Sequence, residues 1–518
     1  MTIQLDNAQG NTAAQQSSVW GNQHAQDGQT VFDPSLEGAH EVTTVDQSRV
    51  DANGRRDQAT QIDGNASNTG SREQTTSSTG QPMFIDKLGS TANVEITREY
   101  TTEQSGGQYY ILADQLVFTT GGGDDQVKVT QGDNGQLRFD VNGEEYDVSL
   151  AQGQQLTVRT GDGNDNIEID SSVTVNFIIE AGAGEDTIQG GSGNDRIDGG
   201  EGNDIINTGN GFNYVFGGSG DDSIVAGDGG NTLYGGDGND SITGGKGNDY
   251  IEGGKGDDAI IATGGKNVLS GGLGDDTITA SGNGDRIYTG AGANTVGNIG
   301  ADGLVYSAGV GDKLVGAGSA DPNVVNVVLN SDAGLKGVKV EGSDAFVQRV
   351  EADLEMLRAS PNGQQMLAEF DKSAAKGNIV TIRELQNVDN GYAQSVYGSD
   401  ITNGRPGNSG PVDISYNPAF AIPELPVPAV TLYHEMSHAY NGVNGTFLPG
   451  TYTGPGPDSP TPNMQIPNAE RQAVGLDTTA DPYDFGDGSG PITHNPYALT
   501  ENGMREEMGL ELRPSYAI

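Results

Sequence analysis

Two histidines and a glutamate in the C-terminal part of the chain have the spacing of a metal-dependent hydrolase. His434 and His438 are four residues apart, and Glu435 directly follows the first of them, in the pattern His-Glu-x-x-His. On a helix, both imidazoles would lie on one face and could share a zinc ion. Glu435 would stand beside them, where it can accept a proton from an attacking water. The alternative, two unconnected histidines on an amphipathic helix, is disfavoured by this spacing.

A catalytic zinc ion usually takes three protein ligands, so a third residue is required. The extended motif with a further glycine and histidine is absent, because Asn441 and Asn444 occupy those two places. The motif resembles that of the gluzincin metallopeptidases, in which the third ligand is a glutamate on a later helix. The resemblance implies Glu470 as the third ligand, with Asn468 as the cap of its helix, and His494 is the rival ligand. An ordinary exposed helical carboxylate is the other interpretation of Glu470.

The elements that must position these residues can also be predicted. Pro428 and Gly442 flank the His-Glu-x-x-His segment as signals for the start and end of a helix. Residues 411–416 alternate between apolar and polar, which predicts a strand. We expect it at the edge of a sheet, where an extended substrate could pair with it, and an ordinary half-buried strand is the equal alternative. Ser360 followed by Pro361 predicts the start of a further helix. Apolar residues recur at helical spacing before it, at Phe346, Val350, Leu354 and Leu357.

A strict period of nine residues runs through the middle of the chain. From Asp186 to Asn294 every ninth residue is Asp or Asn, and the residue two places later is always aliphatic. The pattern Gly-Gly-x-Gly-x-Asp-x-aliphatic-x resembles the RTX repeat. The resemblance implies a right-handed parallel β-roll with inward aliphatic side chains and Ca²⁺ bound by Asp carboxylates and turn carbonyls. Folding should then depend on calcium, because unneutralised rows of Asp repel one another.

The two edges of such a roll differ in charge. One coil takes two repeats, so alternate repeats share an edge. We expect calcium to fill the first edge as a continuous ladder and to bind the second weakly, because an Asn oxygen is neutral. The first edge carries Asp186, Asp204, Asp222, Asp240, Asp258 and Asp276. The second edge is assigned Asp195, Asn213, Asn231, Asp249, Asn267, Asp285 and Asn294.

The overall composition restricts the class of protein. The formal net charge is −46, which disfavours binding to nucleic acid or to anionic lipid. There is no cysteine, which excludes disulfides and thiolate ligands for zinc, and 82 of the 518 residues are glycine. We expect a monomer with a protein substrate, no nucleic-acid partner and no insertion into a membrane, since no apolar stretch is long enough to span one.

These patterns divide the chain into five parts. Residues 1–82 are polar and are expected to form a disordered tail, without the basic and apolar regions of a cleaved signal peptide. Residues 83–180 predict a β-rich segment that leads into the solenoid. The β-roll is expected over 181–300 and a connector over 301–342. An α+β zincin-like metallopeptidase domain is expected over 343–518.

Three segments of the C-terminal domain resemble the NleD-like family of bacterial effector zinc metallopeptidases. They are the helix that carries His434 and His438, the segment 470–476 and the tail 495–516. The resemblance implies a secreted enzyme that is delivered into host cells and cleaves host signalling proteins such as kinases. The repeats are not part of this resemblance, so both type III and type I export remain open.

The end of the chain offers a cation and a phenol three residues apart, Arg513 and Tyr516. This Arg-x-x-Tyr spacing is similar to that of the clostridial neurotoxin gluzincins, which implies that the two residues stabilise the oxyanion of the transition state. Packing of both side chains against the domain is the alternative. The sequence as a whole predicts a zinc endopeptidase with Glu435 as general base. The alternatives are a non-catalytic calcium-binding surface or matrix protein with a decayed peptidase domain, and an epimerase that acts on polysaccharides along the roll.

Overall fold

The computed structural model describes most of the chain as two compact units. The upstream unit comprises Gln23–Asn267 and Asp276–Asn283, and the downstream unit comprises Met1–Asn22, Val268–Asp275 and Gly284–Ile518. The residues that the structure describes are 31–32, 59–66, 72–76, 82–105, 108–132, 135–151, 153–281, 284–308, 311–316, 323–385, 392–395, 398–419, 427–454 and 466–515.

Antiparallel strands open the upstream unit. β4 (Pro82–Ser90), β5 (Glu95–Ser105) and β6 (Gln108–Thr119) form one meander, and β7 (Gln126–Gln131), β8 (Leu137–Val141) and β9 (Glu144–Ser149) form a second. Three shorter strands pair with β6, β9 and β4, namely β1 (Val31–Phe32), β2 (Thr60–Asp63) and β3 (Glu73–Thr76). These three lie within residues 1–82, for which the sequence predicts a disordered tail, and the rest of that stretch lies outside the described residues.

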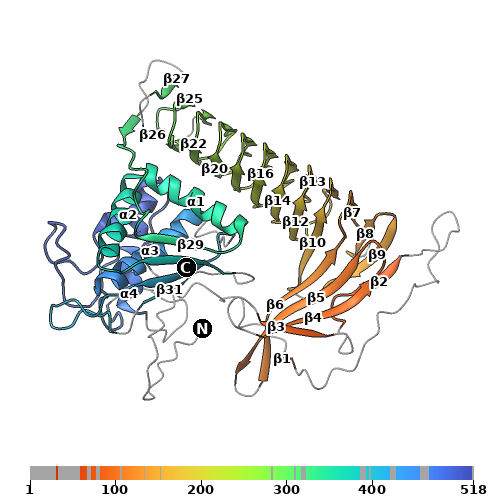
Figure 1. Cartoon of the computed structure of the whole chain (residues 1–518), viewed down its shortest axis with the longest axis horizontal. Helices are drawn as coiled ribbons and strands as arrows, with labels where there is room; N and C mark the ends of the chain where they lie inside the picture. Colours follow the sequence, from red (N-terminus) through yellow and green to blue (C-terminus); the bar gives the residue numbers. More distant parts are fainter. Residues whose placement is uncertain are drawn as a thin grey trace. The chain divides into compact units, whose positions relative to one another are not determined.

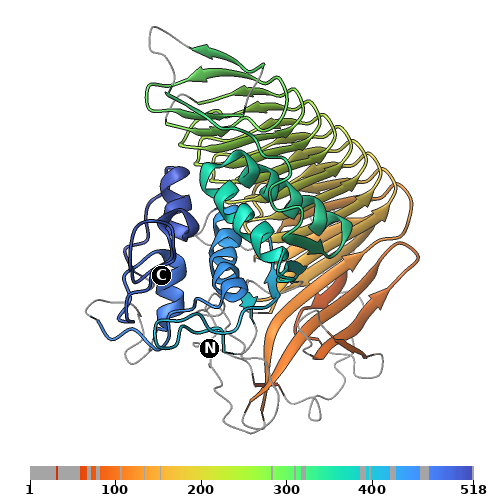
Figure 2. The ribbon, with the colours of Figure 1, turned by 60° about the vertical axis from the view of Figure 1, so that its left-hand side comes forward.

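A parallel β-solenoid follows, as the repeat predicts (Figures 1 and 2). Its strands alternate between two parallel ladders, and partners in a ladder are 18 residues apart through the repeats, as in Ile197 beside Val215. One ladder runs through β10 (Gln155–Asp162), β12 (Phe177–Ala183), β14 (Arg196–Glu201), β16 (Tyr214–Ser219), β18 (Thr232–Asp237) and β20 (Tyr250–Lys255). The other runs through β11 (Asn166–Ile169), β13 (Thr187–Gln189), β15 (Ile205–Asn207), β17 (Ser223–Val225), β19 (Ser241–Thr243), β21 (Ala259–Ile261) and β23 (Thr277–Thr279).

The repeat explains both the core and the turns of this solenoid. The aliphatic residue of each repeat points inward, and Ile197 and Ile206 are both completely buried. Full burial of such a side chain is worth about 1.5–3 kcal/mol, so the row of them supplies the main apolar stabilisation. The turns bring backbones together so closely that only glycine fits. Gly200 has φ of 109°, and a Cβ there would collide with the carbonyl oxygen of Gly182 in the neighbouring coil.

The downstream unit contains coils of its own. β22 (Val268–Leu273), β24 (Arg286–Tyr288), β26 (Leu304–Ser307) and β28 (Asn323–Asn326) are one parallel ladder, and β25 (Thr295–Ile299) pairs with β27 (Lys313–Gly316). The coils thus extend into residues 301–342, which the sequence assigns to a connector. We call residues 284–316 the last coils.

Helices and a small sheet complete the downstream unit. α1 (Asp344–Ala359) and α2 (Pro361–Ala374) form as predicted, with the Ser360 side chain capping α2. α1 packs against β22. The sheet has the order β29 (Val338–Glu341), β30 (Val380–Glu384), β32 (Val412–Tyr416) and β31 (Tyr392–Gln394). The strand predicted at a sheet edge is therefore internal, because β31 pairs with the side of β32 that β30 leaves open.

The predicted His-Glu-x-x-His helix is α3 (Pro428–Asn444), and all its residues from Pro428 to Val443 are buried. It begins at Pro428 as expected but continues past Gly442 and ends at Gly445, which has φ of 69°. Gly442 instead allows close packing, since a Cβ there would meet side-chain atoms of Val412 and Ser395. The later elements are α4 (Asn468–Val474), the 3-10 helix η1 (Tyr497–Leu499) and α5 (Glu501–Glu507). None of the described helices is long and apolar enough to cross a membrane.

Candidate metal centres

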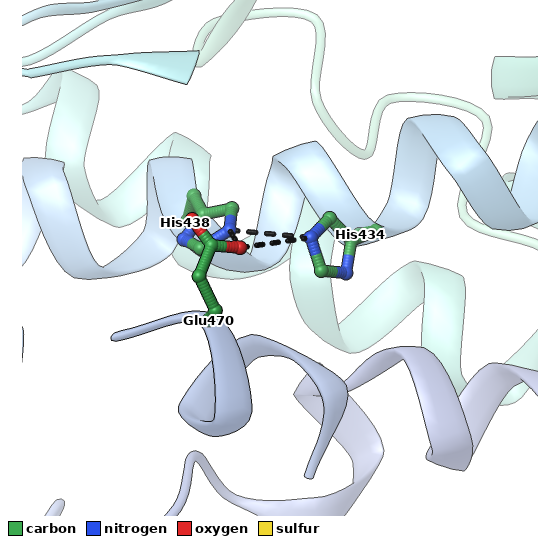
Figure 3. A group of neighbouring side chains, drawn as sticks. All are labelled: His434, His438 and Glu470. Carbon is green, nitrogen blue, oxygen red and sulfur yellow. Dashed lines mark hydrogen bonds and ion pairs between the residues drawn. The ribbon is translucent and has the colours of Figure 1, made fainter. Parts of the chain in front are cut away.

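Three ligand atoms from two helices converge in the downstream unit (Figure 3). Nε2 of His434 lies 3.2 Å from Nε2 of His438, which lies 3.1 Å from Oε2 of Glu470. The third side of this triangle, from Nε2 of His434 to Oε2 of Glu470, is 3.6 Å. All three residues are at most 5% exposed. Among the described residues, these three form the group of His and acidic side chains whose ligand atoms lie close enough together to share one metal ion.

The geometry fits a zinc ion. Zinc bonds to imidazole nitrogen and carboxylate oxygen are about 2.0–2.1 Å long, so the ligand atoms of a tetrahedral site lie about 3.3 Å apart. The three observed separations bracket this value. Two imidazoles and one carboxylate are also the donor set of many catalytic zinc sites, in which the fourth position takes water or substrate. Glu470 meets the histidines because α4 packs against α3. Pro467, rather than the predicted Asn468, occupies the cap position of α4.

The charges around this triangle favour a cation. Burial lowers the pKa of His434, but hydrogen bonds with Glu470 and Glu501 outweigh it and raise the pKa to about 9. Burial raises the pKa of Glu470, yet the two histidines outweigh that effect and bring the pKa to about 2. Carboxylate charge therefore faces the imidazoles at neutral pH, and binding of a metal ion must displace a proton from His434.

Glu501 holds His434 from the side opposite the ligand triangle. Its Oε2 atom lies 3.0 Å from Nδ1 of His434, and the carboxylate is completely buried. A carboxylate accepts, so Nδ1 keeps its proton, and the proton that a metal ion displaces from His434 is the one on Nε2, which faces the triangle. Arg513 donates to Oε2 of Glu501 at 2.8 Å, and Arg505 lies 3.4 Å from Oε1. Burial raises the pKa of Glu501, but Arg513 and His434 reverse this and lower it to about 2.

The remaining predicted site residues lie outside the ligand triangle. Arg513 contacts Glu501, and its backbone N–H and C=O are both bonded by Asn502, which places its guanidinium behind His434. A direct role at the oxyanion would need it on the other side of that ring.

Tyr516 lies outside the described residues. Nδ1 of His494 is 2.5 Å from the carbonyl oxygen of its neighbour Asn495, and His494 is not part of the ligand triangle. Glu435 is completely buried on α3 beside His434, and its charge helps to raise the pKa of that imidazole.

Comparison with protein families assigns this part of the chain. Residues 335–516 match the family Peptidase_M91, described as effector protein. We call residues 335–516 the Peptidase_M91 region, after the effector family that they match. The match begins just before the strand β29 and includes the ligand triangle, Glu501 and Arg513, so the recognition of an effector peptidase is confirmed. No match was found among curated proteins, and none among solved structures.

Upstream of the Peptidase_M91 region, the solenoid matches the RTX calcium-binding nonapeptide repeat. The match covers overlapping segments at residues 178–206, 199–233, 207–242, 225–260 and 261–296. The recognition of RTX repeats is therefore confirmed, and calcium is the cation that these repeats bind. The two matches follow one another along the chain in the predicted order.

The first edge of the solenoid has the features of a calcium ladder. Each of its Asp residues accepts a backbone N–H from the previous coil through Oδ1, as in the 2.8 Å bond from Asp204 to Asp222. Oδ2 is buried, and no donor among the described residues reaches it at Asp186, Asp204, Asp222, Asp240 or Asp258. A Cβ at Gly217 would collide with Oδ2 of Asp222 and with the carbonyl oxygen of Gly235, so these two oxygens lie close together beside a residue that must be glycine. Carboxylate and carbonyl oxygens are the ligands that Ca²⁺ prefers.

The same carboxylates give the calcium-free solenoid an unusual pH dependence. Burial, with smaller contributions from neighbouring carboxylates, raises the pKa of Asp204 to about 7 and that of Asp222 to about 8. The folded state then keeps protons that an unfolded Asp releases near its ordinary pKa of about 3.9. We therefore expect the calcium-free full chain to be most stable near pH 4 and to lose stability as the pH rises through about 7–8.

Urea unfolding between about pH 4 and pH 8, followed by circular dichroism, measures this slope. Asp222→Asn should reduce the slope, since it removes one of the raised groups. Stability of the wild-type solenoid that increases over this pH range in calcium-free buffer would contradict the expectation.

The second edge is closed by amides where it carries Asn, whereas Asp195 and Asp249 on this edge keep a buried Oδ2 that no donor among the described residues reaches. Nδ2 of Asn231 donates to the carbonyl oxygens of Gly227 and Gly229 at 3.1 and 2.9 Å, and Nδ2 of Asn267 donates to that of Gly264 at 2.8 Å. An amide thus bonds the turn carbonyls that a cation would otherwise bind. The assignment of Asn294 to this edge was wrong. Asn294 is 18 residues beyond Asp276, and its backbone N–H donates to Asp312, a further 18 residues on, so it belongs to the first series.

The amide bonds predict that exchanging Asn and Asp between the two edges changes how much calcium stabilises the chain. Asn231→Asp should destabilise the calcium-free chain by about 1–3 kcal/mol, because two buried carbonyls lose their donor and face an anion. Calcium should restore the lost stability. The matched variant Asp222→Asn should instead reduce the stabilisation that calcium gives. Urea unfolding with and without calcium measures both. An Asn231→Asp chain as stable as wild type without calcium would contradict the amide role.

Proposed function

We propose that the Peptidase_M91 region is a zinc-dependent endopeptidase of a secreted effector. The observation that carries this proposal is the convergence of His434, His438 and Glu470 at mutual distances suited to one zinc ion, with Glu435 on the same helix. His434 and His438 would hold the ion through Nε2, and Glu470 through Oε2. The carboxylate of Glu501 supports this arrangement, because it fixes the orientation of His434.

The reaction would be hydrolysis of a peptide bond. A zinc ion bound to the three residues would supply a Lewis acid that polarises the scissile carbonyl and acidifies a water. Glu435 accepts a proton from the attacking water while the water oxygen bonds to the carbonyl carbon. Glu435 then gives that proton to the leaving nitrogen as the C–N bond breaks, so the products are a carboxylic acid and an amine. The burial of Glu435 strengthens these proton transfers, since bulk water does not screen them.

Arg513 has a supporting role in this proposal. Its guanidinium neutralises Glu501 and keeps that carboxylate ionised, so that Glu501 can accept the Nδ1 proton of His434. Tyr516 remains proposed as a phenol donor to the oxyanion, from the resemblance of the Arg-x-x-Tyr spacing. The substrate is proposed to be a protein of a host cell, in keeping with the effector family, and the chain is proposed to act as a monomer after secretion.

Metal dependence tests the proposed function directly. The full chain is stripped of metal, incubated with a peptide library from a host-cell proteome, and the new N-termini are identified by mass spectrometry. We expect cleavage at a restricted set of sequences when one equivalent of zinc is added, and none when magnesium is added in its place. Zinc binding without cleavage of any peptide or of the native host proteins would contradict the enzyme. It would favour a calcium-binding protein with a decayed peptidase domain.

Replacement of Glu501 tests the support of His434. Glu501→Gln keeps the size of the side chain but removes the charge, so we expect zinc affinity to fall about 10–100-fold. Arg513→Met should weaken zinc binding in the same way but less, since Arg505 and His434 still contact the Glu501 carboxylate. Calorimetric titration with zinc measures both. An Arg513 variant that lowers kcat at unchanged zinc affinity would instead support the direct oxyanion role predicted from the sequence.

A further inference from the structure

Two tyrosines of the last coils hold the C-terminal end of α5. The hydroxyl of Tyr288 donates to Oε1 of Glu507 at 3.2 Å, and the hydroxyl of Tyr306 donates to the backbone carbonyl of Glu507 at 3.0 Å. The two rings stack on each other with centroids 4.7 Å apart and planes inclined by 7°. Both tyrosines and Glu507 belong to the downstream unit. The pair is thus a rigid aromatic support for the last residue of the helix.

The first residue of the same helix is Glu501, which holds His434. α5 has seven residues, so its two ends are only about 10 Å apart. A second set of bonds runs through Asn362, whose N–H donates to Oε2 of Glu507 at 3.0 Å. The carbonyl of Asn362 accepts from the hydroxyl of Tyr433, the residue before His434, at 3.0 Å. The last coils therefore hold the helix that orients His434 directly, and they reach the helix that carries it through Glu507 and Asn362.

In the last coils, hydrogen bonds satisfy the carboxylate of Asp312. The Asp residues of the first edge in the upstream unit differ, because their Oδ2 atoms are buried without donors. Oδ1 of Asp312 accepts from the backbone N–H and from Nδ2 of Asn294, at 3.0 and 3.2 Å. Oδ2 of Asp312 accepts from the hydroxyls of Thr289 and Ser307, at 3.0 and 2.6 Å. Four donors thus satisfy the carboxylate that continues the first series. A coil whose polar atoms are satisfied by the chain itself does not need a cation to balance them.

We infer that Tyr288 and Tyr306 are positioning residues for the metal site of the peptidase, and that they hold it independently of calcium. The functional unit of the peptidase then begins at the last coils, about 50 residues before the start of the family match at residue 335. Calcium governs the upstream coils, whereas the coils that support the active site are built to stay folded where calcium is scarce. This rests on the proposed function only for its zinc measurement.

The test compares the full-length double variant Tyr288→Phe/Tyr306→Phe with wild type, after calcium has been removed on a chelating resin. Phenylalanine keeps the stacked rings and removes only the hydroxyls. We expect the double variant to bind zinc about tenfold more weakly, the loss given by one or two buried hydrogen bonds. Hydrogen exchange of the amides of residues 501–507 should be faster in the variant. Wild type should show the same zinc affinity and the same exchange in these residues with and without added calcium.

Tyr250→Phe is the matched control, because Tyr250 also donates to a carboxylate, that of Glu252, from a coil of the upstream unit. It should leave zinc affinity and exchange at residues 501–507 unchanged. A double variant indistinguishable from this control overturns the positioning role. Loss of zinc affinity or of protection at residues 501–507 when calcium is removed overturns the independence from calcium. If wild type binds no zinc at all, the proposed function fails, and the exchange measurement alone decides this inference.

Discussion

Glu435→Gln should bind zinc as wild type does and lose about 10²–10⁴-fold in kcat. Glutamine has the size of glutamate but cannot accept the proton of the attacking water, so hydrolysis loses its general base. The metal ligands are unchanged, because His434, His438 and Glu470 form the triangle without help from Glu435. The fold should also tolerate the change, since it replaces one buried polar group by another of equal volume. Cleavage of a peptide found with the library, together with zinc content by mass spectrometry, measures the two effects separately.

The control for this variant is Glu369→Gln on α2, where the carboxylate pairs with Lys372 at the protein surface. This variant also removes one negative charge, but at a position away from the metal site, so kcat should not change. A Glu435→Gln chain that cleaves at the wild-type rate would remove Glu435 from the mechanism. Loss of zinc in Glu435→Gln would show that the side chain supports the metal site rather than the proton transfer.

Glu470→Gln should lose zinc more severely than any change outside the ligand triangle, and activity should disappear with it. Changes in residues that only orient a metal ligand cost about 10–100-fold in metal affinity, and a direct ligand should cost more. The neutral amide also fails to balance the cation, and the carboxylate that faces both histidines is lost. Zinc affinity from competitive titration is the measurement.

His494→Gln separates the two candidates for the third ligand. His494 lies against the carbonyl of Asn495 and outside the ligand triangle, so this variant should bind zinc like wild type. The opposite pattern, with zinc retained in Glu470→Gln and lost in His494→Gln, would require a rearrangement of the segment around residue 494 and would assign the third ligand to His494.

The parts of the fold that depend on local pattern could be predicted from the sequence. The nine-residue period fixes both the strand and the turn of every coil, because one aliphatic residue per repeat must point inward and the turns require glycine. The helix α3 could be predicted because two histidines four residues apart can share a metal ion when they lie on one face of a helix. Its end was misplaced at Gly442, since a glycine needed for close packing against Val412 looks the same in the sequence as one that ends a helix.

The parts that depend on tertiary contacts could not be predicted. Glu501 has no local feature that distinguishes it from the other acidic residues of the tail, and only its contact with Nδ1 of His434 reveals its place. Arg513 was predicted as a cation for the oxyanion, and its contact with Glu501 is a tertiary contact that the spacing from a C-terminal tyrosine does not reveal. The strand β32 was expected at an edge since the pairing of the short strand β31 cannot be read from its three residues.

The amide-closed turns of the second edge have a consequence for the order in which the solenoid folds. In a repeat array each coil contacts only its neighbours, so folding can start at any coil that is stable enough and propagate along the array. Asn213 and Asn231 occupy successive coils and bond to each other and to their own turns, at 3.2 Å between Nδ2 of Asn213 and Oδ1 of Asn231. These coils need the least calcium on that edge. We expect folding of the solenoid to start at these coils. Calcium binding to the neighbouring coils then extends the folded segment in both directions.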